Sequence, residues 1–512
     1  MTKKYSRRSF LKQSVAAAIV ASPLIAGCER RSVVPADAGS IPYDEFLEYD
    51  CLGLAKLIRD GQVSQLDLVE VVIRRIEATN PSLNFMTSRF YDRARKLAGT
   101  ISTDTGFAGV PMLLKDMIDL AGMPRTDGSN FPPNNVPVHS ALYVQGLERA
   151  GFNFVGMTNV PEYAGVGGTD NDRFGATRNP WNLDFYPYHS SGGAAASVAA
   201  GVLPMAHGTD GAGSNRLPAS VTGLLGMKPT RYRMLADTHN GQHDLAKTNQ
   251  MISRTVRDSA MAFHMTQDPD NGRYPFEERI EHASDRRLRI GLVREKEGLT
   301  ETSAEVVKAI EETAGLLENM GHAIAEAVYP VDPEELFVHY SNFFAGKTST
   351  LKGAVEVATG QPLMESGALT RFLAGNLIAN EQVSAESLVA AQQYIDSLSP
   401  AFDSLFEEFD LLLTPVAPRA GVRLDEFGAD TEYSQRVARQ IIGTMKFTAA
   451  VNLAGCPAMS VPLTWSSAAG LPIGSHFVAA RGKDRMLYEL AFELEEARPW
   501  KDKWAPNSLY FR

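Results

Sequence analysis

One lysine stands where a buried amine could act as a base. Lys115 directly follows the apolar run 109–114, which is typical of a buried strand that ends in an amine. The alternative is an exposed ion pair between Lys115 and Asp116. Burial lowers the pKa of a lysine, and a neutral amine is a competent general base. Lys115 is therefore a candidate base.

Two serine clusters lie in a stretch, 187–230, that is dense in serine, glycine and alanine. Ser190 is followed by a second serine and two glycines, and Ser214 follows the Gly-Ala-Gly sequence at 211–213. Few of these side chains can fill a core, so hydroxyl groups and backbone amides are the working parts. Small residues before a serine let several N–H groups converge on one point, which is how an oxyanion hole is built.

The composition is that of an ordinary globular protein. The chain has 512 residues, of which 44% are hydrophobic and 21% charged, enough for a large core. Its net charge of −10 argues against nucleic-acid binding, because a phosphate backbone demands a basic face.

Other hydrolytic chemistries lack their motifs. The sequence has no GxSxG elbow, no HExxH and no paired CxxC, so neither an α/β-hydrolase nor a catalytic metal is expected, and no cofactor is predicted. Ser349 and Lys352 fit the SxxK pattern of penicillin-recognising enzymes, but no KTG follows them. We interpret that match as chance.

The N-terminus resembles a twin-arginine export signal closed by a lipobox. Arg7 and Arg8 precede the apolar run 15–21, and Cys28 ends the segment. A membrane-spanning anchor is the alternative, but the run is too short to cross a bilayer. We therefore predict a signal peptide at 1–28, with export to the periplasm or cell surface and a lipid on Cys28 that ties the protein to a membrane.

The rest of the chain reads as a tether and one large domain. Residues 29–42 are polar and unpatterned, and we expect the folded domain to occupy 43–512. Cys51 and Cys456 are too few for a disulfide framework, so both are predicted to be free thiols.

Hydrophobic periodicity predicts alternating helices and strands. Helical spacing runs through 54–79 with an interruption at 60–61, which indicates two helices, and it recurs at 304–320 and 486–497. Apolar runs at 154–157 and 290–293 read as buried strands. The alternation predicts an α/β layer protein.

Eight segments of the chain, taken together, resemble the amidase signature family. The order and spacing of the motifs carry the resemblance from about residue 45 to Trp500, and the end of the chain looks closest to the branch of the aminohexanoate cyclic-dimer hydrolases. The family implies an α/β fold in which one large, mixed, twisted β-sheet is sandwiched between layers of helices. The matching segments are 109–116, 156–162, 174–182, 187–230, 254–258, 409–415, 455–458 and 470–474.

The resemblance also assigns roles to residues. It implies that Ser214 is the nucleophile, that Ser190 is a bridging serine preceded by a cis peptide bond, and that Lys115 is the base. The amides of Gly211, Ala212, Gly213 and Ser214 would then form the oxyanion hole.

One position departs from the family pattern. The family has glycine before the bridging serine, whereas this chain has Tyr188 and His189. His189 could adopt the same geometry, line the pocket or alter the proton relay. Asp210 and Arg216 bracket the nucleophile, and we expect an ion pair that stiffens the loop.

The expected activity is hydrolysis of a small-molecule amide through an acyl-enzyme. The alternatives are an esterase or acyl transferase with the same triad, and an inactive amidase-like binding protein. A tRNA amidotransferase subunit is disfavoured because export would separate it from tRNA. The sequence does not decide whether the protein is a monomer or a homodimer. The aromatic stretch 337–344 is expected to pack in the core, with pocket lining as its alternative.

Overall fold

A computed structural model describes residues 45–165, 167–295 and 297–511, which all belong to one compact unit. The predicted export signal at 1–28, with Cys28, and the predicted tether at 29–42 lie outside the described residues. No helix in the described part of the chain is both long enough and apolar enough to cross a membrane.

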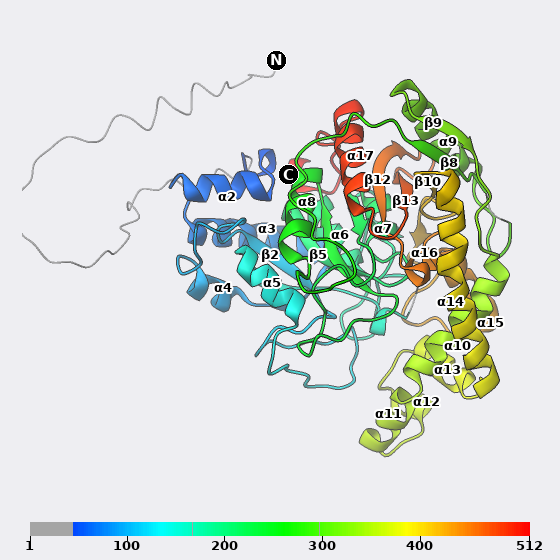
Figure 1. Cartoon of the computed structure of the whole chain (residues 1–512). Coiled ribbons are helices and arrows are strands. Elements are labelled where there is room, and N and C mark those ends of the chain that lie inside the picture. The colour runs from blue at the N-terminus through cyan, green and yellow to red at the C-terminus, as the bar shows by residue number, and fades with distance from the viewer. Residues whose placement is uncertain (1–44, 166, 296, 512) are drawn as a thin grey trace, which may run out of the picture. The chain divides into compact units, whose positions relative to one another are not determined.

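An eight-stranded mixed sheet forms the centre of the domain (Figure 1). Its neighbours pair antiparallel, except that β8 is parallel to both β10 and β9. In spatial order the strands are β5 (Met205–Asp210), β7 (Thr248–Ser253), β6 (Leu225–Lys228), β12 (Ala458–Trp465), β13 (Pro472–Ala479), β10 (Leu411–Pro415), β8 (Arg289–Leu292) and β9 (Ala323–Glu326).

Both faces of this sheet are buried under helices. Successive side chains of a strand point to opposite faces, and β13 shows this directly. The Ser475 hydroxyl lies 2.7 Å from Thr313 of α9 (Ala304–Asn319), whereas the His476 ring contacts Arg216 of α7 (Arg216–Thr222). The central strands β12, β13 and β10 are consequently buried on both sides, and the sheet separates two hydrophobic cores.

A three-stranded sheet carries the predicted base. Its order is β1 (Met86–Arg89), β3 (Asn153–Thr158) and β2 (Pro111–Lys115), with β2 parallel to β3 and antiparallel pairing between β1 and β3. The strand β2 packs beside β5 of the large sheet, where the Lys115 N–H donates to His207 Nδ1 at 3.2 Å. The large mixed sheet that the resemblance implied is the eight-stranded one, and the backbone pairing adds this three-stranded sheet and a two-stranded sheet of β4 (Phe185–Tyr186) and β11 (Val422–Arg423).

The helices confirm the pattern predicted for the N-terminal half. Two helices, α2 (Cys51–Arg59) and α3 (Gln65–Leu83), are separated at the predicted interruption, and α3 begins at a capping box between Ser64 and Asp67. The small-residue helix α6 (Gly192–Ala199) follows the first serine pair. The same part of the chain holds η1 (Glu45–Glu48), α4 (Tyr91–Leu97), α5 (Leu142–Ala150), η2 (Glu162–Ala164), β4 (Phe185–Tyr186) and α8 (Val256–Thr266).

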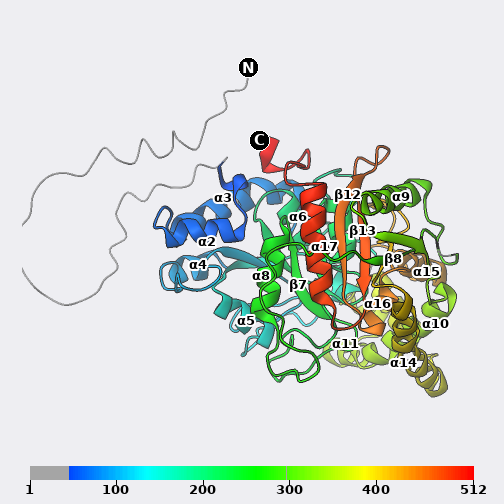
Figure 2. The same cartoon turned by 45° about the horizontal axis from the view of Figure 1, so that its top comes forward.

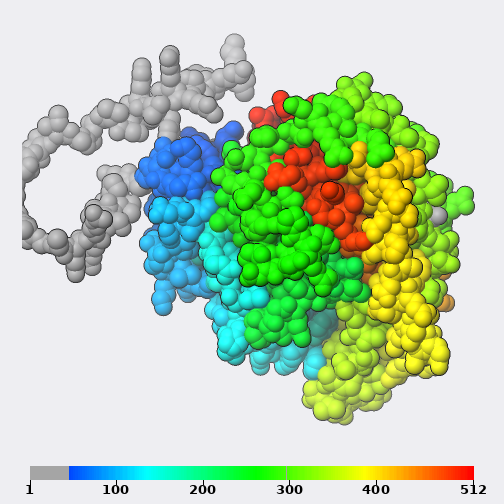
Figure 3. Space-filling view, viewed as in Figure 1, coloured from blue at the N-terminus to red at the C-terminus, as the bar shows by residue number. Residues whose placement is uncertain are grey.

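Helices of the C-terminal half cover one end and one face of the large sheet (Figure 2). The long helix α14 (Ala385–Glu408) packs on α10 (Pro333–Thr348), and α17 (Asp484–Ala497) packs on β12 and β13. In Figure 3 the red surface of the C-terminal part lies between green and yellow segments from mid-chain. The remaining elements are α11 (Leu351–Thr359), α12 (Leu363–Ser366), α13 (Arg371–Asn380), β11 (Val422–Arg423), α15 (Gln435–Gly443), α16 (Ala449–Ala454) and η3 (Leu509–Phe511).

Candidate active site

The predicted base is fully buried at the end of its strand. All five residues of β2 are buried, and Lys115 has no exposed surface. The alternative of an exposed pair with Asp116 is wrong, because Asp116 is also buried and its carboxylate accepts hydrogen bonds from the backbone and side chain of Thr126. Burial, together with the positive charge of Lys247, holds the pKa of Lys115 well below its ordinary value.

Three hydroxyl groups surround the Lys115 amine. Its Nζ lies 2.7 Å from Ser190 Oγ, 3.0 Å from Ser191 Oγ and 2.8 Å from Thr209 Oγ1. A neutral amine has two N–H groups and one lone pair. Ser191 and Thr209 can accept the two N–H groups, which leaves the lone pair for the Ser190 hydroxyl.

The Ser191 hydroxyl is held by its own contacts. It lies 3.1 Å from the Thr209 carbonyl and 3.2 Å from Asn215 Oδ1, and it accepts from the Thr209 N–H at 3.2 Å. Its proton therefore goes to one of these acceptors. Ser191 positions the amine and takes no visible part in a proton relay.

The peptide bond before Ser190 is cis, although its first residue is a histidine. His189 is buried, and in the described part of the chain its Nε2 has no hydrogen-bond partner. Burial and the nearby Lys115 lower the pKa of His189 to about 4, so the ring is neutral near pH 7. The bulky side chain does not prevent the contact between Lys115 and Ser190.

The second serine ends a tight loop between β5 and α7. Ser214 is 8% exposed, and its carbonyl accepts the Ser191 N–H at 3.3 Å, which joins the two serine segments. Within the described residues no hydrogen bond links the hydroxyls of Ser214 and Ser190. Catalytic hydrogen bonds often tighten only when substrate binds, so this gap does not exclude a relay.

The loop amides differ in one respect from the expectation for the oxyanion hole. The Gly213 N–H donates to Asp210 Oδ1 at 2.7 Å and is therefore engaged within the protein. The amides of Gly211, Ala212 and Ser214 have no backbone acceptor in the described residues and stay available to a ligand. The expectation is corrected for Gly213, whose amide shapes the loop.

Gly213 itself must be glycine. Its φ is 122°, and a Cβ there would lie 2.4 Å from Thr448 Oγ1. Neither condition applies at Gly211, where the nearest atom would lie 3.9 Å away, in ordinary contact.

A buried ion pair holds this loop, as predicted. Arg216 Nε lies 2.9 Å from Asp210 Oδ2, and neither side chain is exposed. The sequence did not predict two further members of the network, His476 and Asn452. Both belong to the network, because Arg216 also contacts His476 Nε2 at 2.8 Å and the Asn452 side-chain oxygen, while Asn452 donates to the Asp210 carbonyl at 2.9 Å. These partners come from distant segments, which the local sequence pattern could not reveal.

The histidines near the site have assignable tautomers. His207 Nδ1 accepts the Lys115 N–H, so its proton is on Nε2, which lies 3.3 Å from Asn249 Oδ1. His476 Nε2 faces an Arg216 N–H, so its Nδ1 carries the proton and donates to Thr414 Oγ1 at 2.9 Å. Burial lowers the pKa of both rings.

The other candidate residues do not converge on a site. Ser349 donates to the Gly346 carbonyl, and Lys352 pairs with Glu356 and Glu381, so the SxxK match is no Ser–Lys pair. Cys51 and Cys456 are buried free thiols, as predicted. No cluster of three or more His, Cys, Asp or Glu side chains in the described part of the chain could hold a metal ion.

The aromatic stretch lies on α10 and packs mainly inward. Phe337 is buried in the second core, and Tyr340 and Phe343 are half-buried against it. Core packing is therefore the main role of this stretch.

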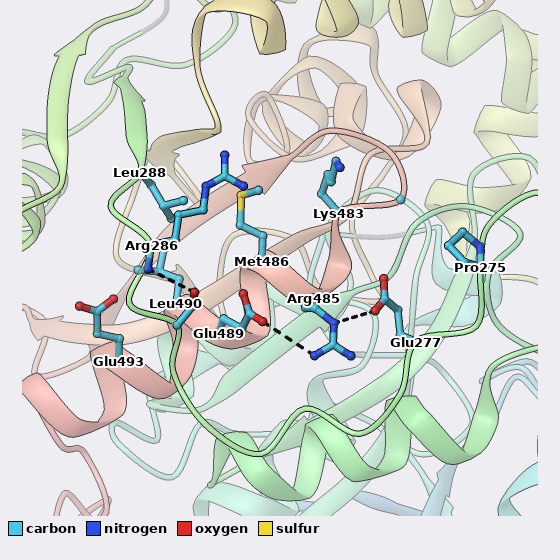
Figure 4. A pocket seen from close by; sticks show the side chains of 12 residues that line it. Pro275, Glu277, Arg286, Leu288, Lys483, Arg485, Met486, Glu489, Leu490 and Glu493 are labelled. Atoms are coloured by element: carbon cyan, nitrogen blue, oxygen red, sulfur yellow. Dashed lines mark hydrogen bonds and ion pairs between the residues drawn. The ribbon is translucent and has the colours of Figure 1, made fainter.

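A hollow of about 290 Å³ lies on α17, lined by none of the predicted site residues (Figure 4). Several of its charged side chains are paired, for example Arg485 Nε with Glu277 at 2.8 Å. A second hollow, of about 450 Å³, lies between α9 and β9 and also excludes those residues. Neither hollow is the candidate active site.

Comparisons with known proteins agree with this fold. The sequence model of the protein family named Amidase matches residues 67–488 of this chain. The 6-aminohexanoate-cyclic-dimer hydrolase of Paenarthrobacter ureafaciens is 31% identical over 88% of this chain and 95% of its own. A Mycobacterium tuberculosis protein with the provisional name amidase AmiC is 34% identical over 91% of this chain and 98% of its own.

Solved structures give the same answer. A 6-aminohexanoate cyclic dimer hydrolase complexed with substrate superposes with a TM-score of 0.79, at 29% identity over 90% of this chain and 99% of that one. A bacterial aryl acylamidase of the amidase signature family superposes with a TM-score of 0.76 at 26% identity, and the match covers 88% of this chain and 96% of that one.

The fold and the matches define a hydrolase of the amidase class that acts on carbon–nitrogen bonds. The chain belongs to the Amidase family, whose signature α/β fold has a large mixed sheet flanked by helices.

Proposed function

We propose that the protein hydrolyses a small carboxylic amide through Ser214, Ser190 and Lys115. The observation that carries the proposal is the buried Lys115 amine, 2.7 Å from Ser190, with two other hydroxyls placed to accept its N–H groups. Desolvation favours the neutral amine, which is the form that a base needs.

The reaction follows from this arrangement. Lys115 takes the proton of Ser190, Ser190 takes that of Ser214, and Ser214 Oγ forms a bond to the substrate carbonyl carbon. The carbonyl becomes an oxyanion, which the N–H groups of Gly211, Ala212 and Ser214 would stabilise; one such donor is typically worth about 2.7–4 kcal/mol.

The cycle closes by the same route in reverse. The carbon–nitrogen bond breaks, and the amine leaves with the proton returned through Ser190. Water then loses a proton to the relay, attacks the acyl-enzyme and releases the carboxylic acid, while Ser214 regains its proton.

An esterase or acyl transferase would use the same residues. The leaving group separates these readings: an amidase turns over anilides and alkyl amides, whereas an esterase turns over only the matched esters. The resemblance to relatives named 6-aminohexanoate-cyclic-dimer hydrolase and aryl acylamidase supports the amide reading. The reading as an inactive binding protein is supported only by His189, which stands where the family has glycine.

The test is amide hydrolysis by the wild-type protein and three alanine variants. Ser214→Ala, Ser190→Ala and Lys115→Ala should each lose activity by at least about a hundredfold. Ser197→Ala is the matched control, because Ser197 is a buried serine in α6 that donates only to the Ala194 carbonyl. Hydrolysis that persists in Ser214→Ala would overturn the proposal.

The N-terminal motif supports a proposal on location. The protein would be exported by the twin-arginine route and anchored by a lipid on Cys28. Cell fractionation with Arg7→Lys/Arg8→Lys tests the route, which predicts that this variant stays in the cytoplasm. The mass of the N-terminal peptide of the mature protein tests the lipid.

A further inference from the structure

The two ends of the described chain lie side by side (Figures 1 and 2). A Cβ on Gly201 would lie 2.8 Å from Leu47 and 3.1 Å from Trp504, so these two side chains meet at the same spot. The chain before Glu45 therefore joins the domain next to its C-terminal segment.

That segment presents an aromatic patch, which we define as Trp504, Tyr510 and Phe511. The rings of Trp504 and Tyr510 are stacked with centroids 5.6 Å apart, and Phe511 lies edge-on to Tyr510 at 5.0 Å. Tyr510 is 54% and Phe511 62% exposed. Two large aromatic side chains thus face outward together.

The patch is firmly attached to the domain. The Leu509 N–H donates to the Ala200 carbonyl at 2.9 Å. The Arg254 guanidinium lies 3.5 Å from the centre of the Trp504 ring and donates to the Lys501 carbonyl at 2.8 Å. The exposed rings are therefore held in a fixed position by these contacts.

The proposed lipid anchor brings a bilayer to this surface. A lipid on Cys28 would leave 16 residues, 29–44, between the membrane and the domain. A chain of that length reaches at most about 53–58 Å when fully extended. The surface around Glu45 would accordingly meet the bilayer far more often than any other surface of the domain.

We propose that the aromatic patch inserts into the headgroup region of the membrane and fixes the orientation of the domain on it. Tyrosine and tryptophan favour this region because their rings are apolar and their edges polar. The inference rests on the proposed lipid anchor.

Charge contributes little to this contact. The exposed Lys501 and Lys503 are opposed by the exposed Asp502, Glu45 and Glu48. The rings must therefore carry the binding, and the contact should not depend on anionic lipid.

The test uses the full-length protein, purified from membranes and placed in phosphatidylcholine vesicles whose acyl chains carry a photoreactive diazirine close to the headgroup. Illumination should crosslink lipid to peptides from 498–511. The peptide with Phe276, an aromatic residue that is 43% exposed elsewhere, should stay unlabelled. Adding phosphatidylglycerol should leave this pattern unchanged.

A matched pair of variants sharpens the result. Tyr510→Ser/Phe511→Ser should lose the crosslinks in this segment, whereas Phe276→Ser should keep them. If the N-terminal peptide carries lipid but no crosslinks appear in 498–511, the proposed membrane contact of the aromatic patch is wrong and the lipid anchor stands. An unmodified Cys28 would overturn the anchor and this proposal together, and neither result affects the amidase proposal.

Discussion

At the scale of single residues, the chemistry depends on one amine without water around it. Lys115 has Ser190, Ser191 and Thr209 as its neighbours, and burial favours its neutral form. The next contribution to its lowered pKa is the positive charge of Lys247, which pairs with Asp237 and lies beside Gly211. Lys247 is thus a residue that sequence reasoning missed.

The activity should depend on pH. A general base works only when neutral, so kcat/KM should fall as the pH drops through the pKa of Lys115. Lys247→Gln removes a positive charge, which raises that pKa, so the acidic limb should move to higher pH and activity near pH 7 should decrease. A pH–rate profile checks this.

Lys352→Gln is the control for this prediction. Lys352 pairs with Glu356 and Glu381 on the surface and does not contribute to the pKa of Lys115. An acidic limb that stays in place in Lys247→Gln would show that another group titrates.

At the scale of elements, the loop between β5 and α7 is the part that must keep its shape. The Gly213 N–H donates a hydrogen bond to the Asp210 carboxylate. That carboxylate also forms an ion pair with Arg216 and accepts a hydrogen bond from Asn452. This network joins the loop to α7 and α16, which come from distant parts of the chain.

Two neighbouring glycines should tolerate alanine very differently. Gly213→Ala adds a Cβ where φ is 122° and Thr448 Oγ1 would lie 2.4 Å away, so the loop must shift and activity should fall by at least about tenfold. Gly211→Ala meets only ordinary contact and should keep most of its activity. Steady-state kinetics compare the two, and equal losses would contradict this account of the loop.

The buried ion pair should matter for stability. Asp210→Asn leaves Arg216 without its counter-charge in the core, which should lower the free energy of unfolding by about 3–5 kcal/mol. Glu432→Gln breaks an exposed pair with Arg371 and should cost less than about 1 kcal/mol. Urea unfolding followed by circular dichroism measures both.

The same pair makes a pH-dependent contribution. Arg216 holds the pKa of Asp210 well below its ordinary value. The stabilisation is therefore present above about pH 4, the unfolded value, and is lost as the pH falls toward the folded one. Asp210→Asn should flatten this acidic loss, and an unchanged pH dependence would contradict the assignment.

At the scale of the whole molecule, the sequence predicted individual helices and strands better than it predicted which strands share a sheet. Apolar runs such as 109–114 and 154–157 and the helical run 304–320 are local, so their elements could be predicted. The separation of β1, β3 and β2 from the large sheet could not be predicted, because it depends on how β2 packs beside β5.

The site shows the same division. Lys115, Ser190 and the Asp210–Arg216 pair were visible as local motifs that resemble a family. Thr209, Asn452 and the engaged Gly213 amide were not, because their roles arise from packing between segments far apart in the chain.

The most direct test of the central claim is labelling of the folded protein by a fluorophosphonate, followed by peptide mapping. The account predicts that the probe attaches to Ser214, that Ser214→Ala is unlabelled, and that Lys115→Ala is labelled far more slowly. Ser197→Ala should react like the wild type. Folded protein that stays unlabelled, or a label on any serine other than Ser214, would contradict the claim that Ser214 is the nucleophile.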